Sequence, residues 1–206
     1  MINIEKHTIF IEEAYSFMMP NHEHWSKEIK NIILVEENKD IHKHSTVLDE
    51  ACNVKAKRTP WDSHYRYPAV LSLTKDLIKI VEDFIKKEDF DAPLIKIEEC
   101  WLNWYNKDNY TTPHNHGGHL SLVYFIDVED TGAKFLFSKN NCYSLEKKEK
   151  NHTRCNNIRE VNVKNGTVLM FNGNLTHGVT PNLSDQTRIT YAANLVVQYM
   201  EKREDY

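Results

Sequence analysis

The chain has 206 residues, a formal net charge of −4 and an isoelectric point near 6.3. This length is enough for one domain with a sizeable hydrophobic core. The mild acidity argues against nucleic acid as a partner, and no apolar run reaches the roughly 18 residues that span a membrane.

The N-terminal residues and the cysteines indicate the cellular compartment. The first residues include glutamates where a secretory signal peptide has a basic region and an apolar core. The four cysteines, Cys52, Cys100, Cys142 and Cys155, contain no C-x-x-C pair. We therefore expect a cytoplasmic protein with reduced thiols. The composition gives no indication of its oligomeric state.

The first part of the chain is predicted to be helical. Apolar residues recur at helical spacing over 21–39, with Asn21 as the expected cap, and more regularly over 73–87. Ser72 or Thr74 is the expected cap of this second helix. Its apolar stripe is predicted to pack against a sheet. The polar and aromatic segment 40–68 is expected to form loops or short strands.

The rest of the chain is predicted to be mainly β. Runs rich in β-branched and aromatic residues are expected to form strands over 94–106, 118–128, 133–138, 158–163, 167–171 and 188–200. Asn165 and Gly166 predict a tight turn that joins two of these strands as a hairpin. The charged segment 138–157 is expected to be a long loop.

Helices followed by strands predict an α+β, mainly β protein built as a β sandwich or barrel. We expect a single domain over 1–206. A helical N-terminal part, 1–92, would pack on the major sheet of a β core, 93–200.

The stretch "HNHGGHL" holds three of the chain's eleven histidines. Residues two apart on a strand share a face, so His114 and His116 project together. His119 points away unless the two glycines before it bend the strand. Two ligands hold a divalent ion weakly, and His177, flanked by small residues further along the chain, is the candidate third ligand. A polar edge strand is the alternative interpretation of the H-x-H pair alone.

The last predicted strand, "RITYAANLVVQYM", begins with an arginine. Arg188, Thr190, Ala192 and Asn194 share one of its faces. A buried arginine without a partner is costly, so an inward Arg188 predicts a carboxylate ligand, which the guanidinium binds through two hydrogen bonds. The alternative is an arginine at a strand end paired with an acidic side chain.

The stretches "HNHGGHLSLVYF", "GTVLMFNGNLTHGVTPN" and "RITYAANL" together resemble the Fe(II)- and 2-oxoglutarate-dependent oxygenases. They are closest to a group of small oxygenases found in phages and bacteria. The similarity covers about residues 55 to 198. It implies a double-stranded β-helix, the jelly-roll fold of the cupins, with Fe(II) as cofactor and 2-oxoglutarate as cosubstrate.

The resemblance also assigns roles to residues of this chain. It makes His114, His116 and His177 the metal ligands, and it places Arg188 and Thr190 on the distal carboxylate of 2-oxoglutarate. Further contacts to the same cosubstrate are expected from Tyr105, Tyr124 and Asn194.

One position departs from the superfamily at large. Its usual ligand set is two histidines and one carboxylate, and here His116 stands where the carboxylate is expected. The three-histidine set leaves the metal with more positive charge, which favours an anionic chelating ligand. The small phage and bacterial group itself often carries H-x-H.

The implied activity is oxidative decarboxylation of 2-oxoglutarate coupled to hydroxylation of an unknown substrate, either a peptide or protein residue or a small molecule. Trp61, in "RTPWDSHYRYP", and His119 are the candidate contacts of a substrate cleft. Two alternatives stay open. One is a three-histidine cupin-like metalloenzyme that does not use 2-oxoglutarate, and the other is a non-catalytic barrel that binds a metal or a small ligand.

Overall fold

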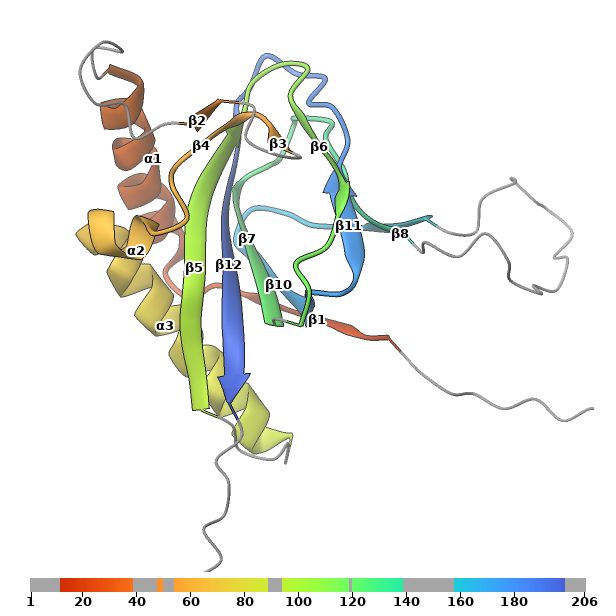
Figure 1. Ribbon diagram of the computed structural model, residues 1–206. Helices are drawn as coiled ribbons and strands as arrows, with labels where there is room; N and C mark the ends of the chain where they lie inside the picture. The colour runs from red at the N-terminus through yellow and green to blue at the C-terminus, as the bar shows by residue number, and fades with distance from the viewer. Residues whose placement is uncertain are drawn as a thin grey trace, which may run out of the picture.

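A computed structural model describes residues 12–38, 48–49, 54–88, 94–118, 120–138 and 158–198. Two antiparallel sheets face each other, and helices cover the outer face of the larger one (Figure 1). The helices are α1 (His22–Asn38), α2 (Ser63–Arg66) and α3 (Pro68–Lys87). This is the helix-on-sheet, mainly β architecture that the order of the predicted elements indicates.

The larger sheet has seven strands, in the order β1 (Ala14–Met18), β10 (Thr167–Asn172), β7 (Leu120–Asp127), β12 (Arg188–Gln198), β5 (Leu94–Tyr105), β4 (Lys57–Arg58) and β2 (Leu48–Asp49). The smaller sheet has five strands, in the order β3 (Val54–Lys55), β6 (Tyr110–His114), β11 (Thr176–Val179), β8 (Phe135–Ser138) and β9 (Ile158–Val161).

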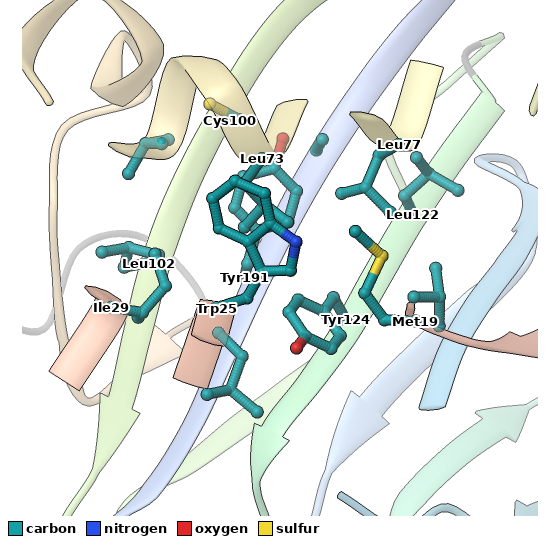
Figure 2. Packing of buried hydrophobic residues seen from close by; sticks show 14 of the residues in the cluster. Met19, Trp25, Ile29, Leu73, Leu77, Cys100, Leu102, Leu122, Tyr124 and Tyr191 are labelled. Carbon is teal, nitrogen blue, oxygen red and sulfur yellow. The ribbon is translucent and has the colours of Figure 1, made fainter. Parts of the chain in front are cut away.

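The main hydrophobic core lies between the helices and the larger sheet. Helix α1 contributes Trp25 and Ile29, and α3 contributes Leu73 and Leu77, which are all buried (Figure 2). Burying a side chain of this size contributes roughly 1.5–3 kcal/mol. The stripe predicted over 73–87 therefore packs against the sheet as expected.

Helix α3 begins earlier than its apolar stripe predicts. It starts at Pro68, whose fixed φ suits the first helical position, and Tyr67 precedes it without a side-chain cap. The prediction of Ser72 or Thr74 as the cap is therefore wrong. The Thr74 hydroxyl instead donates to the Val70 carbonyl and lies 2.8 Å from the Tyr191 hydroxyl.

The predicted hairpin around Asn165 and Gly166 is also wrong. Strand β9 pairs with β8 in the smaller sheet, whereas β10 pairs with β1 and β7 in the larger one. The turn itself is present, with Gly166 at φ +88° and the Thr167 amide donating to the Lys164 carbonyl. It carries the chain from the smaller sheet, which contains β9, to the larger sheet, which contains β10.

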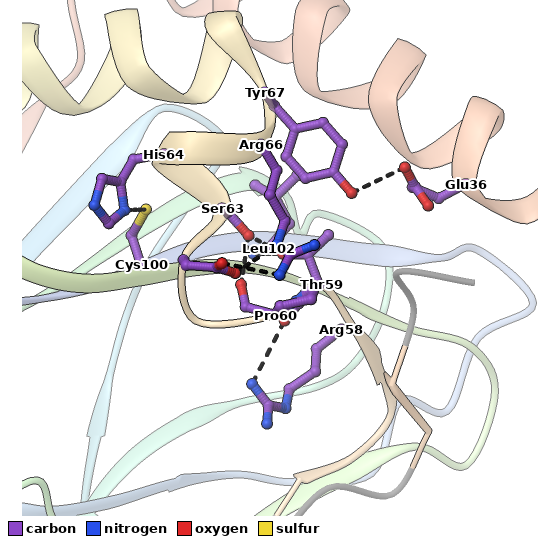
Figure 3. A network of polar contacts seen from close by, with 11 residues as sticks. Glu36, Arg58, Thr59, Pro60, Ser63, His64, Arg66, Tyr67, Cys100 and Leu102 are labelled. Atoms are coloured by element: carbon purple, nitrogen blue, oxygen red, sulfur yellow. Dashed lines mark hydrogen bonds and ion pairs between the residues drawn. The ribbon is translucent and has the colours of Figure 1, made fainter. Parts of the chain in front are cut away.

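The described residues before 94 are not only helical. Strand β1 forms one edge of the larger sheet, β4 and β2 lie at its other edge, and β3 belongs to the smaller sheet. Side-chain hydrogen bonds attach this part of the chain to β5. The Leu102 amide donates to Thr59 Oγ1, which bonds Ser63 Oγ (Figure 3). The Tyr67 hydroxyl reaches the buried Glu36 of α1 (Figure 3).

Several predicted features lie outside the described residues. They are His119, Cys52, Cys142, Cys155 and nearly all of the loop predicted over 138–157. Cys100 is a buried free thiol, and burial raises its pKa to about 11. Within the described ranges, the helices are all too short or too polar to cross a membrane.

Candidate active site

The predicted metal ligands meet between the two sheets. His114 ends β6 and lies directly across from His177 of β11, while His116 follows β6 in the chain. The candidate ligand atoms of the three side chains lie within 4.8 Å of one another, and the Nε2 atoms of His116 and His177 are 3.3 Å apart. In the described part of the chain, no carboxylate joins this group.

Backbone carbonyls orient two of these imidazoles. His114 Nδ1 lies 2.9 Å from the Thr112 carbonyl, and His177 Nδ1 lies 2.8 Å from the Leu175 carbonyl. A carbonyl only accepts hydrogen bonds, so each Nδ1 carries the proton and each Nε2 keeps its lone pair for a metal. The three side chains therefore fit an ion such as iron, for which imidazole is a suitable ligand.

Burial favours the neutral forms of His114 and His177. It lowers the pKa of His114, and it lowers the pKa of His177 to about 3 with the further effect of the two neighbouring imidazoles. Phe135 stacks on the His177 ring with 5.6 Å between the ring centroids, and Phe171 contacts the same ring edge-on with 4.8 Å between centroids. This apolar surround limits the access of water, and neutral imidazoles are the metal-binding form.

Arg188 is the charged group of the same pocket. Its side chain is fully buried, and one nitrogen, Nη1, donates to the Ala133 carbonyl at 3.2 Å. The buried Nε and Nη2 atoms have no hydrogen-bond partner among the described residues. Burial lowers the pKa of Arg188 to about 10, so the guanidinium stays charged at neutral pH. Two unpartnered donors on a buried cation fit a carboxylate ligand.

Three of the other predicted cosubstrate contacts also line the pocket. Thr190 lies next to Arg188 on the same face of β12, and Tyr105 pairs with Arg188 across β5 and β12. The Tyr105 hydroxyl is 2.9 Å from Thr111 Oγ1. Asn194 lies further along β12, and its side-chain amide forms hydrogen bonds with Ser121 and Glu99. Only Thr190 and Tyr105 therefore lie beside Arg188.

The prediction that Tyr124 contacts the cosubstrate is wrong. Tyr124 lies on the opposite face of the larger sheet, inside the hydrophobic core, where its hydroxyl is 2.6 Å from His22 Nδ1 (Figure 2 shows its ring among the core side chains). Its neighbours Val123 and Phe125 line the pocket instead. The strand "LSLVYFID" is apolar on both faces, so the sequence alone does not indicate which residues point inward.

Trp61 does not line the pocket. Its side chain is 48% exposed, and the Arg58 guanidinium lies 4.5 Å from the centre of its ring. The structure thus places Trp61 at the surface, against the buried Arg58. The expected contact of Trp61 with a substrate stays a prediction.

Several pocket residues were not predicted, among them two residues of β5. Trp101 and Asn103 lie on the same face of β5 as Tyr105, and both line the pocket. Trp101 Nε1 and Asn103 Oδ1 are buried without a hydrogen-bond partner in the described part of the chain. The signal that could have found them is the alternation of β5, because residues two apart from Tyr105 share its face.

Comparison with known protein families gives the context for this pocket. Residues 99–194 match the model of a family described as "Putative 2OG-Fe(II) oxygenase". Over these residues the chain is similar to the 2OG-Fe(II) oxygenases. The cofactors predicted from the sequence, Fe(II) and 2-oxoglutarate, are those of this family. No curated protein matched the sequence significantly.

Several solved structures share the fold. HygX from Streptomyces hygroscopicus with nickel, 2-oxoglutarate and hygromycin B bound aligns with a TM-score of 0.61 at 14% identity, covering 89% of this chain and 82% of that one. A Pseudomonas putida prolyl-4-hydroxylase aligns with a TM-score of 0.61 at 10% identity, covering 92% and 94%. AviO1 from Streptomyces viridochromogenes Tue57 aligns with a TM-score of 0.64 at 13% identity, covering 90% of each chain. The predicted double-stranded β-helix is thereby confirmed.

Proposed function

We propose that this oxygenase binds Fe(II) through His114, His116 and His177 and couples the oxidative decarboxylation of 2-oxoglutarate to the hydroxylation of a second substrate. The second substrate is a small molecule or a residue of a peptide or protein. When bound, the iron and its cosubstrate supply the oxidising chemistry, which protein side chains lack.

The observation that carries this proposal is the position of Arg188. Its two unpartnered nitrogens are buried in the same pocket as the histidine group. A buried guanidinium without an anion is costly, and 2-oxoglutarate has a distal carboxylate that would supply both hydrogen bonds. Thr190 and Tyr105, on either side of Arg188, add hydroxyl groups at this end of the pocket.

The remaining pocket residues would hold the reactants in place. Three neutral imidazoles would leave the full double charge on a bound Fe(II), which would strengthen the attraction of the pocket for an anionic ligand. Phe125, Phe135 and Phe171 keep the pocket apolar around these charges. A dry pocket makes each electrostatic contact stronger than it would be in water.

The proposal is tested by incubating the purified chain with Fe(II), ascorbate, oxygen and 2-oxoglutarate, and by measuring succinate. We expect succinate to form slowly even without the second substrate, and to stop when a chelator removes the iron. If no iron-dependent succinate appears while the protein binds iron, the alternative of a three-histidine metalloprotein that does not use 2-oxoglutarate is correct.

A further inference from the structure

The pocket has a second polar end that the proposed cosubstrate does not use. Within β12, Arg188 pairs with Tyr105, and Asn194, further along the strand, pairs with Glu99. At about 3.3 Å of rise per residue, these two pairs are about 20 Å apart. Trp101 lies between them on β5, and the centre of its ring is 5.9 Å from that of His116. Trp101 and Asn194 line this end of the pocket, which begins beside the histidine group, and Glu99 adjoins it through its hydrogen bond with Asn194.

Trp101 offers an unused hydrogen-bond donor at this end. The residue is only 5% exposed, it lines the pocket, and its Nε1 has no partner within the described residues. A buried N–H group without an acceptor costs free energy, and native structures seldom leave one unpaired unless a ligand or water completes it. An indole only donates, so the missing partner is an acceptor such as a carbonyl or hydroxyl oxygen.

Glu99 offers a carboxylate that the protein holds in place. Alternation along β5 puts it on the same face as Trp101. Asn194 Nδ2 donates to Glu99 Oε1 at 2.7 Å, and Ser121 Oγ donates to Asn194 Oδ1 at 2.9 Å. Because both the oxygen and the nitrogen of the Asn194 side chain form hydrogen bonds, Asn194 holds the Glu99 carboxylate in one orientation. No Lys, Arg or His of the described residues forms an ion pair with it.

We propose that Trp101 and Glu99 form the subsite that selects the second substrate, and that this substrate carries a protonated nitrogen next to a hydrogen-bond acceptor. The nitrogen binds the Glu99 carboxylate, and the acceptor receives the Trp101 N–H. This places the carbon to be oxidised beside His116, at the histidine group. The assignment rests on the proposed function for its chemistry, but its ligand preference can be measured by binding alone.

The test uses the full chain loaded with Mn(II) and 2-oxoglutarate, which binds without turning over. The probes are primary amines that carry a nearby carbonyl or hydroxyl, namely amino-acid amides, dipeptides ending in lysine or arginine, and aminosugars. Each is compared with its N-acetylated or neutral counterpart by calorimetry. We expect at least one amine to bind about 10-fold or more tightly than its neutral counterpart, as a charge-assisted hydrogen bond implies.

Two conservative variants locate this preference. Glu99→Gln keeps the shape and the acceptor for Asn194 but removes the charge, so it should abolish the preference for the amine. Glu98→Gln, at the exposed neighbouring position, is the matched control and should keep it. Trp101→Phe keeps an aromatic ring, although a smaller one, and removes the N–H. It should therefore weaken the binding of the amine and of its neutral counterpart alike, by about 3- to 10-fold.

Other results would overturn the assignment. If no probe binds the wild-type chain, or if amines and neutral counterparts bind equally, Glu99 does not select a cation. If Trp101→Phe weakens the binding of 2-oxoglutarate instead of the binding of the amine, the indole contacts the cosubstrate. Failure of the proposed function would look different, because wild-type protein would then form no iron-dependent succinate whatever the outcome of these binding comparisons.

Discussion

His114 and His177 lie directly opposite each other on neighbouring antiparallel strands, β6 and β11, with their ring centroids 4.4 Å apart. The residue after His177 makes this close approach feasible. A Cβ on Gly178 would lie 3.0 Å from the Thr111 carbonyl oxygen and 3.3 Å from the Pro113 nitrogen, which are backbone atoms of β6. The pairing of the two histidines therefore depends on a glycine.

Gly178→Ala should push β11 away from β6. Overpacking of this kind typically costs about 1–3 kcal/mol of stability, and here it should also weaken metal binding because it separates His177 from His114. Thermal unfolding and calorimetric titration with Mn(II) would measure the two effects. Gly118→Ala is the control, since a Cβ there meets open space. Equal metal affinity in the two variants would show that the Gly178 contact does not set the geometry.

His177→Ala should lower metal affinity by at least about 100-fold, because losing even an outer-shell partner of a ligand commonly costs about 10- to 100-fold. Titration with Mn(II) or Fe(II) under anaerobic conditions measures this. His24→Ala, which removes an exposed histidine of α1, should bind metal like the wild type. Retention of tight binding by His177→Ala would remove this residue from the ligand set.

Arg188→Ala should weaken 2-oxoglutarate binding about 10- to 100-fold or more, since it removes charge-assisted hydrogen bonds to the distal carboxylate. Metal affinity should be nearly unchanged, because Arg188 does not belong to the histidine group. Arg188→Lys should recover part of the affinity through its charge but lack the two-pronged geometry. Arg159→Ala, at an exposed position of β9, is the control. Equal 2-oxoglutarate affinity in Arg188→Ala and Arg159→Ala would refute the role of Arg188.

His64 predicts a pH dependence of stability. Burial lowers its pKa, and its ring lies against Cys100, with 3.4 Å between Nδ1 and Sγ (Figure 3). The unfolded chain therefore binds a proton at His64 more readily than the folded chain. Its contribution to stability is complete above the unfolded pKa of about 6.5 and is lost as the pH falls below it, by at most about 1.4 kcal/mol per unit.

Denaturant unfolding of the wild type and of His64→Gln between about pH 5 and about pH 7.5 checks this effect around the unfolded pKa. The wild type should lose more stability than the variant at the acidic end. His24→Gln removes an exposed histidine and should follow the wild type. Parallel curves for all three proteins would mean that His64 titrates alike in the folded and unfolded chains.

The sequence predicted the face of β12 correctly because its two sides differ in chemistry. Arg188, Thr190 and Asn194 alternate with apolar residues, so the polar face can be identified from the period of two alone. Tyr124 was misplaced because β7 is apolar on both faces. Trp101 was not predicted as a pocket residue, since an aromatic side chain on a strand can face either layer.

The pairing of the strands was less predictable than their positions. The Asn165–Gly166 pair indicates a local turn, and the turn is present with Gly166 at positive φ. It cannot indicate that β9 and β10 belong to different sheets, because that depends on contacts with β8 and β7 far along the chain. The strands contributed by the residues before 94 are two to five residues long, too short for a periodic signal.

The most direct test of the central claim is an anaerobic crystal structure of the chain with Mn(II) and 2-oxoglutarate. The account predicts one metal ion bound by the Nε2 atoms of His114, His116 and His177, with the keto acid end of 2-oxoglutarate on the metal and its distal carboxylate on Arg188 Nε and Nη2. Metal bound elsewhere, or 2-oxoglutarate absent from Arg188 at saturating concentration, would contradict it.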